Sequence, residues 1–164
     1  MHGYEMFQTL IARREDRIVK VRPGSLYHVV YRLAEEKLIR QTSTGRTGNR
    51  PERTIFEITD LGIEGLTNRV RELVATPTNE FPRFVVALAE IHNLDRGTAV
   101  AAVRVRIAAL EADLAKMAAD RGSSGAAAIY LTALDYLVAT TRAKIDWLRE
   151  FAESMESGTY EVAI

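Results

Sequence analysis

The second half of the chain is dominated by apolar residues that recur alternately three and four positions apart. Alternating spacing keeps such residues on one side of an α-helix, so it predicts two long helices that pack along a common seam. Residues 122–125, which contain two glycines, separate the two segments as a flexible turn. The seam residues are Val100, Val103, Ile107, Leu110, Leu114 and Met117, followed by Ala127, Leu131, Leu134, Val138, Thr141, Ile145, Leu148, Ala152 and Met155.

A second apolar stripe, formed by Tyr130, Leu137, Trp147 and Phe151, lies beside the seam in the last helix. A helix that is apolar on two adjoining stripes needs more than one neighbour, and an isolated helical hairpin cannot cover both. We therefore expect the chain to dimerise through these helices. The candidate interface residues are Val103, Ile107, Leu110, Leu114, Leu134, Val138, Ile145, Trp147, Leu148 and Phe151.

The first half of the chain begins with two shorter helical patterns. Residues 2–14 carry apolar side chains at helical spacing, and Pro23 occupies the position of a first helical residue. In the helix that starts there, we expect Leu26, Val29, Val30 and Leu33 to be buried. The opposite face and its flanks carry Gly24, Ser25, Tyr27, His28, Tyr31, Arg32 and Glu35, a mixture suited to a DNA groove.

A β-hairpin should follow the second helix. Residues 38–43 and 54–59 alternate in part, and residues 44–53 between them are rich in Gly, Asn, Pro and Arg. Residues 59–62 then begin a helix that extends to about Ala75, with an inward stripe of Ile63, Leu66, Val70 and Leu73 or Val74. Pro77 interrupts this helix, so we place a domain boundary between residues 1–76 and 77–164.

Helix, turn, helix and hairpin occur in the order of a winged helix-turn-helix. The predicted fold is therefore mainly α (α+β), with a winged helix-turn-helix domain followed by a long helical dimerisation arm. In such domains the second helix enters the major groove and the wing follows phosphates. The charge distribution agrees, because a net charge of zero divides into +3 over residues 1–60 and −3 over residues 61–164.

Several short motifs of the first half resemble the PadR family of transcriptional regulators. They are His-Gly-Tyr-Glu at residues 2–5, Pro-Gly-Ser-Leu-Tyr at 23–27, Tyr-Arg-Leu at 31–33, Leu-Ile at 38–39 and Phe-Glu-Ile-Thr-Asp-Leu-Gly at 56–62. The resemblance covers residues 1–75, and the two later helices are similar to the longer arm of the family. Two features depart from the family: a helix usually precedes the first motif, and Lys37 stands where Gly is common.

The resemblance implies a homodimeric repressor that binds double-stranded DNA at a pseudo-palindromic operator and releases it on binding a planar aromatic compound. The candidate DNA-binding residues are Arg22, Ser25, Tyr27, His28, Tyr31, Arg32, Arg46, Asn49, Arg50 and Arg53. Tyr130, Tyr136 and Trp147, with Phe151, are candidates for the effector pocket, although aromatic residues at helical spacing also form plain cores. Tyr27 and Tyr31 have the same alternative of packing against a neighbouring helix.

Other function classes are less well supported by the sequence. The three histidines are dispersed, there is no cysteine, and no Gly-rich phosphate loop follows a strand, so we expect neither an enzyme nor a cofactor or metal site. A winged-helix module that binds protein rather than DNA remains the alternative. The sequence contains neither a membrane-length apolar run nor a signal-peptide pattern, which favours a cytoplasmic location without membrane partners.

Overall fold

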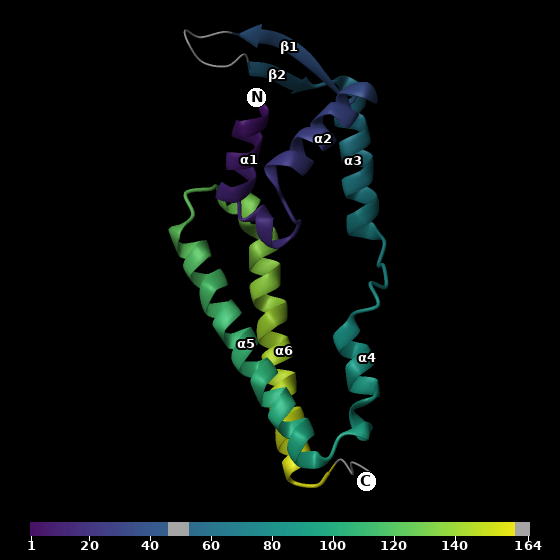
Figure 1. Ribbon diagram of the computed structural model, residues 1–164, viewed down its shortest axis with the longest axis vertical. Coiled ribbons are helices and arrows are strands. Elements are labelled where there is room, and N and C mark those ends of the chain that lie inside the picture. The colour runs from purple at the N-terminus through teal and green to yellow at the C-terminus, as the bar shows by residue number, and fades with distance from the viewer. Residues whose placement is uncertain (46–52, 160–164) are drawn as a thin grey trace. The chain divides into compact units, whose positions relative to one another are not determined.

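The computed structural model describes residues 1–45 and 53–159, which are mainly helical with a two-stranded antiparallel sheet (Figure 1). The predicted fold class is confirmed. The chain divides into two compact units, residues 1–78 and 79–164, which are described separately below. None of the helices in the described ranges combines the length and the apolar character needed to cross a membrane.

The first unit has the element order expected of a winged helix-turn-helix. Helix α1 begins at Gly3 behind a capping box, in which the His2 imidazole accepts the Glu5 amide and the Glu5 carboxylate accepts the His2 amide. Pro23 is the first residue of α2, as its fixed φ and missing N–H favour. The elements are α1 (Gly3–Ala12), η1 (Glu15–Arg17), α2 (Pro23–Glu35), β1 (Ile39–Gly45), β2 (Arg53–Ile58) and α3 (Asp60–Ala75).

Strand β2 is paired along both of its edges, with β1 on one side and with the first two residues of the chain on the other. Ile39 pairs with Ile58, and the register shifts between Gln41 and Ser43. On the other edge of β2, the backbone groups of Met1 and Phe56 exchange two hydrogen bonds of 2.9 and 3.0 Å. His2 continues this pairing through an antiparallel bridge. The beginning of the chain therefore anchors α1 to the sheet.

The core of the first unit is small. Val30 of α2 and Phe56 of β2 are buried, and Leu26 and Leu33 are half-buried, but Val29 is exposed. The expected burial of the α3 stripe is wrong: its apolar residues are 51–83% exposed, because no other element in the described part of this unit covers that side of the helix. These stripe residues are Ile63, Leu66, Val70, Leu73 and Val74.

The second unit contains the two long helices with the expected seam. Asp95 caps the start of α5. The helix extends to Ser123, which lies beyond the start of the expected turn at residue 122. A 3₁₀ segment then precedes α6. Tyr130 therefore belongs to that segment and not to the long helix. The elements are α4 (Arg83–Ala89), η2 (Ile91–Asn93), α5 (Arg96–Ser123), η3 (Ala128–Leu131) and α6 (Thr132–Glu156).

Helices α5 and α6 run antiparallel and side by side (Figure 1). Three interhelical ion pairs show this direction, joining Arg104 to Glu156, Glu111 to Arg149, and Arg121 to Asp135. Because all three pairs are exposed, each contributes at most about 1 kcal/mol, and the buried seam is the main source of stability. Its best-packed part consists of Ala99, Val103, Leu148, Ala152 and Met155.

Candidate nucleic-acid interface

The exposed face of α2 carries most of the residues that were predicted to contact DNA. Ser25, Tyr27, His28, Tyr31 and Arg32 are all exposed, while Val30 on the opposite face is buried. Helical periodicity brings these side chains to one side of α2 and its flanks. The helix therefore has a free polar and aromatic surface backed by the small core.

Two tyrosines on this face are also fixed by contacts inside the unit. The ring of Tyr27 packs on Gly3 of α1, where a β-carbon would be 2.4 Å from Tyr27 Cε1. The ring of Tyr31 lies edge-to-face with Phe56, with 6.3 Å between their centroids. Tyr27 and Tyr31 nevertheless remain 43% and 56% exposed. Tyr27 therefore packs against a neighbouring helix, as the alternative predicted, whereas Tyr31 packs against a strand; part of each ring remains exposed.

The polar residues of α2 differ in the hydrogen bonds and ion pairs that they form within the chain. The Ser25 hydroxyl donates to the Arg22 carbonyl at 2.9 Å, which leaves its lone pairs free to accept. Arg32 forms a loose ion pair with Glu36 at 3.7 Å, and both side chains are largely exposed. Exposed pairs of this kind are weak, so a phosphate could replace Glu36 at little cost. His28 is exposed and forms no hydrogen bond or ion pair within the described part of the chain.

The predicted wing residues fall mostly beyond what the structure describes. Arg46, Asn49 and Arg50 lie outside the described residues. Arg53 is the first residue of β2 and pairs with Gly45, which places its backbone at the base of the loop. The described part of the hairpin ends at the Gly45–Arg53 pair, at the end opposite to the Ile39–Ile58 pair.

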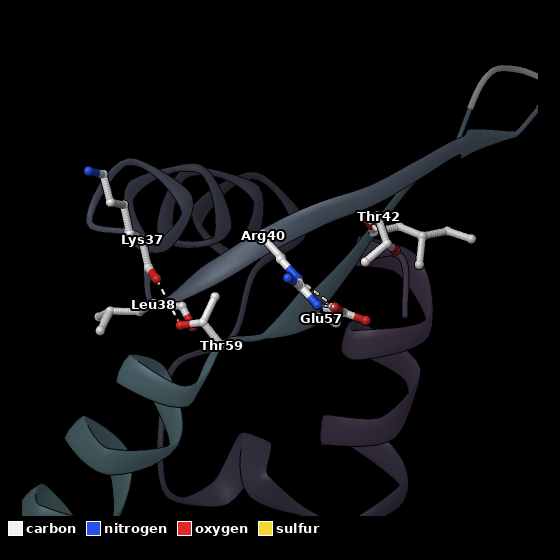
Figure 2. A network of polar contacts seen from close by, with 7 residues as sticks. Lys37, Leu38, Arg40, Thr42, Glu57 and Thr59 are labelled. Carbon is white, nitrogen blue, oxygen red and sulfur yellow. Dashed lines mark hydrogen bonds and ion pairs between the residues drawn. The ribbon is translucent and has the colours of Figure 1, made fainter.

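Sequence reasoning missed one cation on the wing. Arg40 of β1 lies opposite Glu57 of β2, and the two side chains form an ion pair (Figure 2). Neighbouring residues alternate between faces of a strand, so this pair lies on the face opposite to the buried Phe56. The alternation of residues 38–43 could have indicated Arg40, but not its pairing with Glu57.

Hydrogen bonds of Thr59 connect the wing to α3 (Figure 2). Its hydroxyl donates to the carbonyl oxygens of Lys37 and Leu38 at 2.8 and 3.1 Å, and accepts the Gly62 amide at 3.0 Å. The same side chain therefore caps α3 and joins it to the start of β1. Lys37, where the sequence departs from the common Gly, has a φ of 60° in the left-handed region that favours glycine.

The first unit matches a known protein family. The model of the "Transcriptional regulator PadR-like family" matches residues 1–68, which span α1, α2, the wing and half of α3. These residues form a domain of the PadR-like family of transcriptional regulators. No curated protein sequence matches the chain.

Solved PadR structures share the fold of nearly the whole chain. Bacillus subtilis PadR in complex with operator DNA matches with a TM-score of 0.75 and 16% identity, over 94% of this chain and 91% of that one. The same regulator in complex with p-coumaric acid gives 0.70 and 15%, over 95% and 90%. A PadR-like regulator from Bacillus cereus gives 0.62 and 18%, over 94% and 87%.

The second unit divides the predicted dimer-interface residues into two groups. Val103, Leu134, Ile145 and Leu148 are buried by the chain itself, so they belong to its own core and offer no surface to a partner. Heptad spacing marks a seam, and α5 and α6 complete this seam within one chain. Partly exposed candidates remain, namely Ile107, Leu110, Leu114, Val138, Trp147 and Phe151.

The predicted effector residues do not come together. Trp147 stacks on Phe151 with 5.0 Å between ring centroids, but Tyr136 is eleven residues earlier in α6, about 16 Å along the helix. Tyr130 lies earlier still, in η3. Trp147 instead lines a cavity of about 590 Å³ between α4, α5 and α6, which neither tyrosine lines. Among the described residues, no three potential metal-binding side chains form a cluster.

Proposed function

We propose that this chain is a transcriptional repressor that binds a pseudo-palindromic operator as a homodimer and releases it when a small aromatic effector binds. The observation that carries the proposal is the exposed face of α2, with Ser25, His28 and Arg32 available beside the wing, in a domain of the PadR-like family. A surface of this kind is suited to reading base edges in the major groove. The DNA complex and the p-coumaric acid complex of the Bacillus subtilis relative support both parts of the proposal.

Exposed apolar surface supports the homodimer. The α3 stripe and the partly exposed aromatic residues Trp147 and Phe151 are unusual for a chain that works alone. In a twofold dimer, two copies of α2 would lie roughly 34–36 Å apart, one turn of DNA. In this arrangement residues 1–76 form the DNA-binding domain and residues 77–164 the dimerisation domain.

We assign different roles to α2 and the wing. His28 and Arg32, with Ser25, Tyr27 and Tyr31, would contact bases or nearby phosphates from α2, and Arg22 a phosphate at its start. Arg46, Asn49, Arg50 and Arg53 would hold the wing on the DNA backbone. Base contacts determine sequence preference, whereas phosphate contacts determine affinity and its salt dependence.

The experiment is an anisotropy titration of the chain's own promoter region at several salt concentrations, with light scattering for mass. Replacing Arg46, Arg50 and Arg53 by Gln should weaken binding and reduce the salt slope by about 2 to 3, since each phosphate contact contributes about 0.9. Arg32→Ala should instead change which operator variants are preferred. Arg69→Gln with Arg71→Gln on α3 is the control for charge alone.

The alternative is a winged-helix module that binds another protein, and the exposed α3 stripe is the observation that favours it. This alternative predicts a salt slope that the wing substitutions do not change, together with weak binding that is the same for every DNA sequence. A dimer with specific, salt-sensitive binding would exclude it.

A further inference from the structure

His28 occupies the middle of the exposed face of α2. The helix spans Pro23–Glu35, and the His28 side chain is exposed. In the described part of the chain it forms no hydrogen bond or ion pair, so both ring nitrogens are available to a ligand. One turn earlier, a β-carbon on Gly24 would meet nothing within 4 Å. DNA can therefore approach the imidazole closely from the start of the helix.

The elements that pack against α2 bring no charged partner to His28. In the described structure, Glu5 of α1 is occupied in the cap of its own helix. Arg40 and Glu57 pair with each other on the sheet face opposite to Phe56, the residue whose ring contacts α2. The charged residues of α1, β1 and β2 are Glu5, Arg40, Arg53 and Glu57.

Within α2, the charged neighbour of His28 is a cation. Arg32 follows His28 by one turn on the same side of the helix, and its ion pair with Glu36 is loose. The described part of the chain thus places no anion where it would hold a proton on the imidazole, whereas DNA would bring phosphates to it. Histidine is the side chain that ordinarily changes its charge between about pH 5 and pH 8.

We propose that His28 makes operator recognition depend on pH, because its imidazole binds DNA more strongly when it is protonated. A neutral imidazole has one donor and one acceptor, but the imidazolium has two donors. Two donors match the acceptors that DNA presents, namely guanine N7 and O6 in the major groove and the phosphate oxygens beside it. Each protomer then takes up a proton as it binds, so acidification tightens the complex. This inference rests on the proposed function and adds regulation to the same site.

Anisotropy titrations of the labelled promoter region from about pH 5.5 to about pH 8, at constant ionic strength, measure this coupling. The affinity should rise about tenfold or more between about pH 8 and pH 6, because a charge-assisted hydrogen bond is gained. If a phosphate is the acceptor, the salt slope should steepen by about 0.9 for each protomer. If guanine is the acceptor, the ranking of operator variants should change with pH instead.

Two substitutions separate charge from hydrogen bonding. His28→Gln keeps a donor and an acceptor but cannot be protonated, so its affinity should not change with pH. His28→Lys is charged throughout this range, so its affinity should also be constant and should exceed that of His28→Gln. His92→Gln is the matched control and should keep the pH response, because His92 is an exposed histidine of η2 in the second unit. Circular dichroism at each pH checks that the helices are retained.

Two outcomes would overturn the pH proposal alone. Specific operator binding that does not change with pH would remove the coupling and leave the regulator proposal standing. A pH response that persists in His28→Gln would assign the coupling to another group, such as His2 in the cap of α1. The absence of specific binding at every pH would instead contradict the proposed function and this inference together.

Discussion

The ring of Tyr27 lies directly on Gly3, so that a β-carbon at residue 3 would be 2.4 Å from Tyr27 Cε1. This contact joins the first helix of the PadR-like domain to the helix proposed to read DNA. Gly3 is buried and is the first residue of α1, and the Tyr27 ring fills the position that a β-carbon of residue 3 would occupy. The glycine of the first motif therefore positions a side chain that is 24 residues away in sequence.

Gly3→Ala should destabilise the fold by about 1–3 kcal/mol, because the Tyr27 ring must move to accept the added methyl group. Urea denaturation measures the effect. In a Tyr27→Ala background the ring is gone, and the same Gly3→Ala change should cost almost nothing. Equal costs in both backgrounds would show that the two residues are not coupled.

Gly62 and Gly65 of α3 should respond to alanine in opposite ways. A β-carbon at Gly62 would be 2.0 Å from the Leu38 carbonyl oxygen, a backbone atom that Thr59 also binds, so Gly62→Ala should cost about 3 kcal/mol or more. At Gly65 the nearest atom is 3.8 Å away, and Gly65→Ala should stabilise by about 0.5–1 kcal/mol. Thermal melts of the two variants test this pair, and a shift of the same sign in both would contradict it.

Lys37→Gly should stabilise the protein by about 1 kcal/mol. Lys37 has a φ of 60°, a conformation in which a β-carbon is strained and glycine is not. Lys37→Ala is the control, because it removes the charge but keeps the β-carbon. We expect no gain from alanine, and an equal gain from both variants would attribute the effect to charge.

The capping carboxylate of Asp95 predicts a pH dependence. The Thr98 hydroxyl first, and then the Thr98 amide, donate to this carboxylate and lower the pKa of Asp95 below its ordinary value of 3.8. A lowered folded-state pKa means that the stabilisation is present above pH 3.8 and is lost as the pH falls through the folded value. Asp95→Ala should thus be less stable than the parent protein at pH 7, and the difference should shrink below pH 3.8.

Asp95→Asn separates charge from capping in this experiment. Asparagine still accepts the Thr98 amide, so most of the capping should remain, while the pH-dependent part should disappear. Chemical denaturation of all three proteins between pH 2.5 and pH 7, a range chosen to span roughly the ordinary carboxylate pKa, makes the comparison. Parallel stability curves for the parent and Asp95→Asn would refute the role of the charge.

Local signals were enough to predict where elements begin. Pro23 and Thr59 lie at the starts of α2 and α3 because their preference for these positions depends on the neighbouring backbone alone. The motif pattern of residues 2–62 likewise indicated the family, which the family model confirms. The DNA-contact residues of α2 stay predictions, although the structure places them together on an exposed face.

The sequence did not predict which apolar surfaces pack against each other. The α3 periodicity identified the apolar side of the helix but not whether anything covers it, and the structure leaves Leu66 and Val74 exposed. The heptad spacing similarly could not distinguish packing within one chain from packing between two. Leu148 therefore belongs to the core of its own chain, and Trp147 lines a cavity that exists only because α4 packs near it.

The pairing of Met1 and His2 with β2 also affects whether the exposed wing can aggregate with other molecules. Unpaired strand edges can recruit strands of other molecules and lead to aggregation. The outer edge of β2 is occupied at Phe56 and Ile55, and the other strand, β1, has the polar sequence Arg-Gln-Thr-Ser-Thr from residue 40 to 44. A two-stranded sheet arranged in this way can project from the domain and still resist adding further strands.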